Sequence, residues 1–239
     1  MTVRLVSLSF ASLHPDELAP FWAHALGSHA ESDSGDVVLV PDDGTGFHLI
    51  FTPTTVPKTG QNRIHFDLTT ASLDDQTNTV ASLLARGGRH VDIGQTPDED
   101  HVVLADPEGN ELCVLAPGSN FLAGCPRLGA VNCDGTHELG VFWSQALGWP
   151  LVWDHGEETA IQHPSGNGPK VTWSGTPLMP RWGHERLHFH VEPSPGLTAE
   201  AAAEQLLAIG ARRLADDAAC PGAHAFADAD GNAYCLLAP

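Results

Sequence analysis

The chain has 239 residues, of which 42% are hydrophobic and 17% charged, a composition typical of a globular protein. Its 11 Lys and Arg against 30 Asp and Glu give a net charge of −19, which argues against nucleic acid and membrane surfaces as partners. The N-terminus has no long apolar segment, so we expect neither export nor a membrane span, and a cytoplasmic location. The five cysteines form no C-x-x-C motif, which favours reduced thiols over disulfides.

The first predicted elements are a strand and a helix. The apolar residues Val6, Leu8 and Phe10 alternate with the partly polar set Leu5, Ser7 and Ser9. This period-2 pattern predicts a strand with one apolar face. Residues 16–26 then carry apolar side chains at spacings of three and four. This spacing predicts a helix that ends at Gly27.

Six short strands and one further helix complete the first half. The Pro41-Asp-Asp-Gly44 segment is a strong turn signal between two of the strands. The helix pattern covers 72–86 and ends at a pair of glycines. The predicted strands cover 37–40, 48–51, 64–68, 90–93, 101–104 and 111–115.

The second half repeats the landmarks of the first in the same order. Matching residues are separated by 121 to 123 positions, which indicates a duplicated domain rather than a short-period solenoid. The repeated segments are Phe21-Trp22 with Phe142-Trp143, Arg63–Leu68 with Arg186–Val191, and Asp106–Pro117 with Asp228–Pro239. The second copy predicts helices over 137–147 and 198–209. We expect domains at 1–117 and 127–239, joined by a linker at 118–126.

Each domain consists of two strand–helix–strand–strand–strand units, and four such units resemble the vicinal-oxygen-chelate superfamily. That superfamily includes glyoxalase I, extradiol dioxygenases and bleomycin-resistance proteins, and more narrowly the chain resembles the glyoxalase-like proteins common in actinobacteria. The segments that carry the resemblance are Asn62–Asp67, Leu83–Gly87 and Asp106–Cys113. The resemblance implies an α+β fold of four βαβββ modules, forming two tandem glyoxalase-like domains with cupped mixed sheets. It implies a small-molecule ligand but does not choose an activity, because the fold hosts both enzymes and binders.

The resemblance also implies where metal ligands would lie. Metal enzymes of the superfamily take a His or Gln from the first strand of a domain, a His from the strand opening its second half, and a Glu from its last strand. These positions fall on Leu5, His65 and Cys113 in the first domain and on Leu128, His188 and Cys235 in the second. Because leucine cannot bind a metal, we expect the inherited centre to be lost and no cofactor. Zinc or another divalent metal at His188, His190 and Cys235 is the alternative.

Strand alternation predicts two cavities, one in each domain. In the first we expect His65, Asp67 and Glu111 as acid–base candidates, with Cys113, Ser7 and Ser9 as ligand contacts. In the second we expect His188, His190, Cys235 and Asn132, and Trp173 and Trp182 as aromatic contacts of a flat ligand. A structural role stays open for each: a buried histidine bonded to its sheet, a Glu111 carboxylate bonded to turn amides, and tryptophans in the core.

Three functions are compatible with these residues. The first is a small-molecule-binding protein without the usual metal ligands, with a metal-independent lyase or isomerase activity on a small metabolite. The second is a protein that sequesters an antibiotic or metabolite unchanged. The third is a metal-dependent enzyme of the glyoxalase or dioxygenase kind. Two fused domains that pair within the chain predict a monomer, with a homodimer as the alternative.

Overall fold

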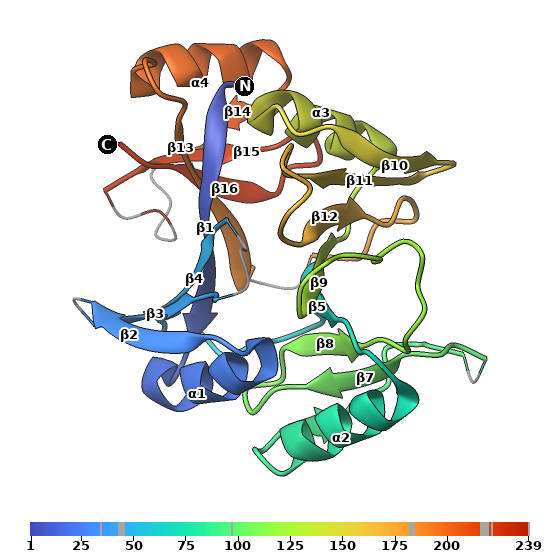
Figure 1. Cartoon of the computed structure of the whole chain (residues 1–239). Coiled ribbons are helices and arrows are strands. Elements are labelled where there is room, and N and C mark those ends of the chain that lie inside the picture. Colours follow the sequence, from blue (N-terminus) through green and yellow to red (C-terminus); the bar gives the residue numbers. More distant parts are fainter. Residues whose placement is uncertain are drawn as a thin grey trace.

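The computed structural model describes residues 1–33, 35–42, 46–96, 98–181, 185–215, 220 and 222–238. Within them the chain forms four helices and sixteen strands arranged as four successive βαβββ units (Figure 1). The predicted α+β class and the unit order are both confirmed. No helix in the described ranges is long and apolar enough to cross a membrane.

The first repeat contains units 1 and 2. Unit 1 comprises β1 (Val3–Ser12), α1 (Pro15–Leu26), β2 (His29–Asp33), β3 (Asp36–Val40) and β4 (His48–Pro53). Unit 2 comprises β5 (Ile64–Leu68), α2 (Leu73–Leu84), β6 (Arg89–His90), β7 (Val102–Ala105) and β8 (Glu111–Val114).

The second repeat contains units 3 and 4. Unit 3 comprises β9 (Leu128–Cys133), α3 (His137–Leu147), β10 (Leu151–His155), β11 (Glu158–Gln162) and β12 (Lys170–Trp173). Unit 4 comprises β13 (Leu187–Pro193), α4 (Ala199–Ala208), β14 (Arg212–Arg213), β15 (His224–Ala227) and β16 (Ala233–Leu236).

The helix boundaries follow from capping residues. The side chains of Ser72, Thr136 and Thr198 accept hydrogen bonds from first-turn N–H groups of α2, α3 and α4. Gly27 and Gly148 end α1 and α3 in the left-handed region, at φ 64° and 65°, which other residues rarely adopt. All four helices therefore lie where the sequence predicts them, within one or two residues at each end.

The strands are confirmed with two differences. The polar segment of β2 carries no apolar alternation, so no pattern in it predicts a strand. β6 is two residues long instead of the predicted four, because only Arg89 and His90 pair with β7. Part of the predicted turn at 41–44 lies outside the described residues.

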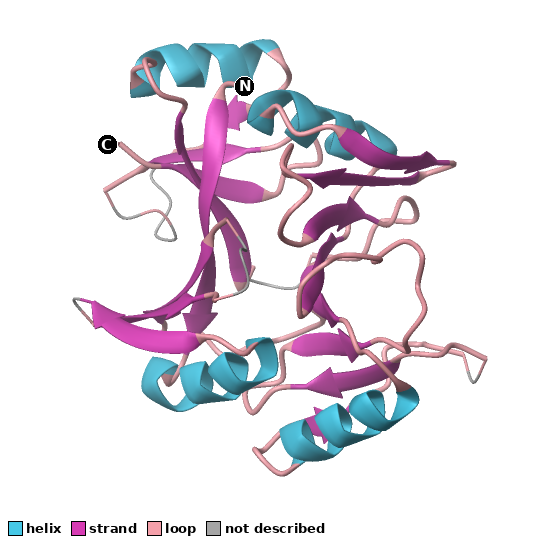
Figure 2. Ribbon diagram, in the orientation of Figure 1, coloured by secondary structure: helices cyan, strands magenta, loops and turns pink. Residues whose placement is uncertain are grey.

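The two sheets each combine one unit from each repeat. The order in sheet A is β14-β15-β16-β13-β1-β4-β3-β2, which joins units 1 and 4; the order in sheet B is β10-β11-β12-β9-β5-β8-β7-β6, which joins units 2 and 3. Both junctions are antiparallel, β1 with β13 and β5 with β9. Each sheet is mixed, because β1 pairs with β4 and β5 with β8 in parallel. Figure 2 shows the two groups of strands with the helices at their flanks.

One continuous core joins the sheets. Trp22 of α1 belongs to a unit of sheet A but packs against Phe66 of β5 in sheet B, with ring centroids 5.1 Å apart. Trp143 of α3 makes the reciprocal contact, at 5.1 Å from Phe189 of β13 in sheet A. Both tryptophans are almost fully buried. Burying such large side chains stabilises the fold and fixes one sheet relative to the other.

Candidate functional sites

The two sheets present polar side chains on the face opposite the core. In β5, Phe66 packs on Trp22, so His65 and Asp67 point to the other side of sheet B. In β13, Phe189 packs on Trp143, so His188 and His190 point to the other side of sheet A. Each sheet therefore carries one candidate site.

In sheet B, His65, Asp67 and Cys113 form a group that we call the His–Asp–Cys cluster. Its donor atoms all lie within 4.8 Å of one another. His65 Nε2 lies 3.4 Å from Asp67 Oδ1, and Asn132 of β9 donates a long hydrogen bond of 3.4 Å to Asp67 Oδ2. Cys113 reaches the group from β8, which pairs with β5 at Asp67. The His65 side chain is 22% exposed, so solvent reaches the cluster.

The charges in this cluster follow from its contacts. Burial on its own lowers the pKa of His65, but hydrogen bonds to Asp67 and Cys113 and the negative charge of Asp67 outweigh it and raise that pKa to about 10. Burial raises the pKa of the Cys113 thiol, although His65 opposes this. At neutral pH the cluster therefore holds an imidazolium at His65 and a neutral thiol at Cys113.

Glu111 lies on the same face of β8 as Cys113 but is engaged elsewhere. Its carboxylate accepts a 2.6 Å bond from Lys58 Nζ and a 3.1 Å bond from the backbone N–H of Asn62. It is 6% exposed, and it is not in the His–Asp–Cys cluster. Glu111 thus ties the segment before β5 to β8.

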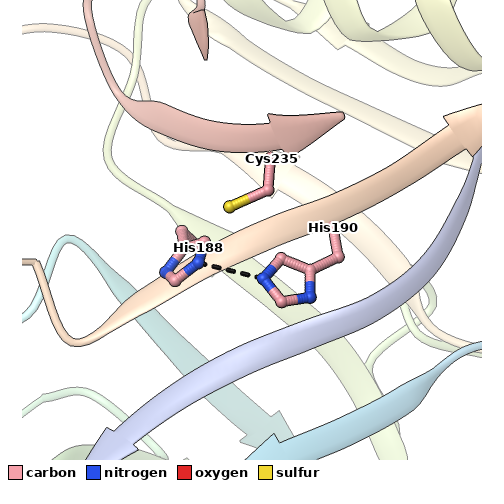
Figure 3. A group of neighbouring side chains, drawn as sticks. All are labelled: His188, His190 and Cys235. Atoms are coloured by element: carbon pink, nitrogen blue, oxygen red, sulfur yellow. Dashed lines mark hydrogen bonds between the residues drawn. The ribbon is translucent and has the colours of Figure 1, made fainter. Parts of the chain in front are cut away.

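In sheet A, the second group is the His188, His190 and Cys235 set, which we call the His–His–Cys cluster (Figure 3). The two Nε2 atoms of the histidines are 3.1 Å apart, so one donates a hydrogen bond to the other. His190 Nδ1 lies 3.2 Å from Ser7 Oγ of β1. Ser9, paired with His188 across the β1–β13 junction, is 2% exposed. Burial and then the neighbouring His188 lower the pKa of His190 to about 4, so that this ring is neutral.

Cys235 is joined to Cys220 by a disulfide. The expectation that all five cysteines are reduced thiols is therefore wrong for this pair. The pairing could not be predicted because the two residues are 15 positions apart, which is no recognised cysteine spacing. Cys113, Cys125 and Cys133 are free thiols, as predicted.

The structure also corrects the predicted grouping of residues. Ser7 and Ser9 were expected beside His65, but β1 pairs with β13 and places them beside His188 and His190. Asn132 was expected beside the second-domain histidines, but β9 pairs with β5 and places it on Asp67. The physical reason is that strand pairing at both junctions crosses between the repeats.

The two predicted aromatic contacts fall elsewhere. Trp173 is 1% exposed and belongs to the core, where it borders a central cavity of about 40 Å³ between the sheets. That cavity is also lined by Arg63, whose Nε lies 2.7 Å from Asp134. Trp182 lies outside the described residues.

A pair of buried hydrogen bonds was missed by sequence reasoning. The indole N–H of Trp22 donates to Asp106 at 2.9 Å, and that of Trp143 donates to Asp228 at 3.3 Å. Burial raises the pKa of both carboxyls, that of Asp228 to about 6. The signal was present, because both Trp–Asp pairs are repeated at separations of 84 and 85 residues. These bonds attach α1 and α3 to the turns before β8 and β16.

Both clusters fit a divalent metal in part. The His–Asp–Cys cluster offers imidazole, carboxylate and thiol donors, a set that suits zinc by type and spacing. A metal there has to displace protons from His65 and Cys113. The His–His–Cys cluster has two imidazoles, but its sulfur is not a thiolate while the disulfide is intact. The two residues at the inherited first-strand positions, Leu5 and Leu128, are buried in the core.

Solved structures with the same architecture include glyoxalase I from Zea mays, which shares 13% identity over 99% of this chain and 92% of that chain, with a TM-score of 0.67. A V278E mutant of the same enzyme shares 16% sequence identity over 99% of this chain and 92% of that chain, with a TM-score of 0.63. A Bacillus subtilis protein provisionally assigned as a dioxygenase shares 13% sequence identity over 98% of this chain and 84% of that chain, with a TM-score of 0.61. At these identities the likeness concerns the fold alone.

Among curated proteins, none matches this chain. The sequence model of a family described as a glyoxalase-like domain matches twice, over residues 7–115 and 130–237. The two matches cover most of the chain and coincide with its two repeats. The protein therefore belongs to the glyoxalase-like family and consists of two tandem copies of its domain.

Proposed function

We propose that this protein binds a small, oxygen-rich, anionic metabolite at the His–Asp–Cys cluster of sheet B. The observation that carries the proposal is the ion pair between His65 and Asp67, which keeps a positive charge on a partly exposed imidazole. Asp67 balances the charge of the imidazolium, and the partly exposed His65 ring remains a charged N–H donor for an anionic oxygen of the ligand. Asn132 and Cys113 supply the neighbouring polar contacts.

Proton transfer to the bound ligand is the catalytic form of this proposal. His65 gives its proton to a developing oxyanion and takes one back when the product leaves, as in a metal-independent lyase or isomerase. Asp67 holds the imidazole in place and stabilises its charged form. If a metal binds, His65, Asp67 and Cys113 are the residues that hold it, and it supplies Lewis-acid polarisation of the ligand oxygen.

Binding without turnover is the second candidate, and the contacts of Glu111 favour it. Glu111 is one of the acid–base candidates that the sequence predicts, yet its carboxylate accepts hydrogen bonds from Lys58 and the Asn62 N–H. A site with an acid but no free base binds an oxyanion more readily than it abstracts a proton. Ligand sequestration is the expected outcome of such an arrangement.

We propose a monomer as the functional unit. Each sheet already pairs one unit of each repeat, and both junctions lie within a single chain. Sedimentation at several concentrations tests this, and a stable dimer would contradict it.

The test of the function is a thermal-shift screen of small carboxylates, hydroxy acids and dicarbonyl compounds. A true ligand raises the melting temperature of the wild type and of His155→Gln, an exposed histidine of the distant edge strand β10, but not of His65→Gln. Equal shifts in all three proteins would contradict the proposal. Mass spectrometry of the recovered ligand then separates the two forms, because a changed molecule indicates an enzyme and an unchanged one indicates sequestration.

A further inference from the structure

The His–His–Cys cluster of sheet A and Cys220 together offer four potential zinc ligands, and the disulfide decides how many of them are available. The ligand atoms of His188, His190 and Cys235 lie within 4.8 Å of one another (Figure 3). Cys220 is bonded to Cys235 through the disulfide and therefore lies next to this group. We propose that reduction of the Cys220–Cys235 disulfide creates a Cys₂His₂ zinc site from these four residues, and that reoxidation expels the metal. This inference concerns sheet A and goes beyond the function proposed for sheet B.

The spacing of the imidazoles supports the site. Tetrahedral zinc, bound at about 2.0–2.1 Å by each nitrogen, sets two imidazole nitrogens roughly 3.3 Å apart. The Nε2 atoms of His188 and His190 are 3.1 Å apart and face each other. Little movement is therefore needed for both to turn from their mutual hydrogen bond to one metal ion.

The surroundings are those of a structural zinc site. His190 Nδ1 faces Ser7 Oγ at 3.2 Å, so that when Nε2 binds zinc the Nδ1–H donates to this hydroxyl and holds the ring. The two cysteines and Ala225 form a small buried apolar cluster, with Leu214 and Leu237 packed against it. Such a shell excludes water from the metal and from the sulfurs.

The donor set selects zinc over harder metals. Two thiolates and two imidazoles are the ligands of structural zinc sites, whereas calcium and magnesium prefer carboxylates and carbonyls. With the disulfide closed, only the two imidazoles remain, and two neutral ligands hold zinc weakly. The oxidised and reduced proteins are therefore expected to differ strongly in zinc affinity.

The chemical steps balance with a dithiol as the reductant. The dithiol transfers two electrons and two protons to the disulfide, leaving two thiols on the protein and a cyclic disulfide of the reductant. Zinc then replaces the two thiol protons, which pass to the buffer. In the reverse direction an external disulfide takes two electrons from the two thiolates, the Cys220–Cys235 bond forms, and Zn²⁺ leaves.

The experiment is a competition titration of zinc against a coloured chelator, on full-length protein with and without a non-chelating phosphine reductant. We expect tight binding of one zinc per chain in the reduced wild type, and loss of at least about tenfold in affinity on reoxidation. Cys220→Ser should bind weakly in both conditions. Cys113→Ser, which alters only the other cluster, should keep the full redox difference.

Cobalt substitution gives a second measurement that does not depend on the titration. Reduced wild-type and Cys113→Ser proteins should show a thiolate-to-cobalt charge-transfer band, and in Cys220→Ser its intensity should fall by about half because one of two thiolates is missing. Circular dichroism confirms that each variant is folded. Equal zinc affinity in oxidised and reduced wild type, or loss of the band in Cys113→Ser but not in Cys220→Ser, would overturn the proposal.

Discussion

The two polar clusters occupy equivalent positions in the two repeats and yet have opposite electrostatic character. His65 corresponds to His188 and Cys113 to Cys235, but Asp67 corresponds to His190. Burial alone would lower the pKa of His65, but its hydrogen bonds to Asp67 and Cys113 raise it, whereas burial and then the neighbouring His188 both lower the pKa of His190. The residue at this one strand position, Asp67 or His190, therefore distinguishes the two clusters.

The sulfur chemistry diverges in the same way. Cys113 is a free thiol whose pKa burial raises, and Cys235 is bonded to Cys220. The duplicated fold supplies the same three positions twice, and the differing residues and one additional cysteine give the two clusters different donor groups. This comparison can be tested by removing each difference in turn.

The largest effect of a single substitution on stability at one pH is expected from the disulfide. A cross-link closing a loop of about 15 residues stabilises a protein by about 3 kcal/mol in the chain-entropy account, and Cys220 and Cys235 are 15 positions apart. Cys220→Ser should lower the free energy of unfolding by about 3 kcal/mol, measured by urea denaturation with a metal chelator present. Adding a reductant to the wild type should remove most of the difference, and a variant as stable as the untreated wild type would contradict the prediction.

The next effect concerns the position at which the clusters differ. Asp67→Asn removes a negative charge 3.4 Å from His65 Nε2, and the pKa of His65 should fall by about two units. NMR titration of the histidine ring protons measures it, with His65→Gln identifying the resonance. Asp67→His should lower the pKa further and make the cluster resemble that of sheet A. An unchanged pKa in both variants would show that Asp67 is not the cause.

The sequence predicted the elements better than it predicted their neighbours. Alternation and capping residues located the four helices and the strand β5, because these signals act within a few residues. Nothing in the alternation of β1 specifies β13 as its partner, so Ser7 was assigned to the wrong histidines. The Cys220 partner was missed for the same reason, since contacts between distant segments depend on the topology of the whole chain.

A third prediction compares how the stability of the wild type and of Asp67→Asn depends on pH. The pKa of His65 is raised from 6.5 to about 10 in the folded protein, so its contribution is fully present below pH 6.5 and is lost as the pH rises toward 10. In that window the wild type should lose up to about 1.4 kcal/mol of unfolding free energy for each pH unit. Asp67→Asn should show a shallower slope in denaturant titrations at pH 6.5, 8 and 9.5. Parallel slopes would contradict a raised pKa.

The smallest effects on the free energy of unfolding are expected at Ser7 and Asn132, which contact a cluster formed by residues of the other repeat. Ser7 approaches His190 at 3.2 Å, whereas Asn132 approaches Asp67 at 3.4 Å, near the limit of a hydrogen bond. Ser7→Ala should therefore cost about 1 kcal/mol of unfolding free energy and Asn132→Ala less than about 0.5 kcal/mol. Urea denaturation at pH 7 resolves the order. If Asn132→Ala costs more, the Asn132 amide is bound more firmly than its distance indicates, and the pairing of β5 with β9 contributes directly to the charge of the His–Asp–Cys cluster.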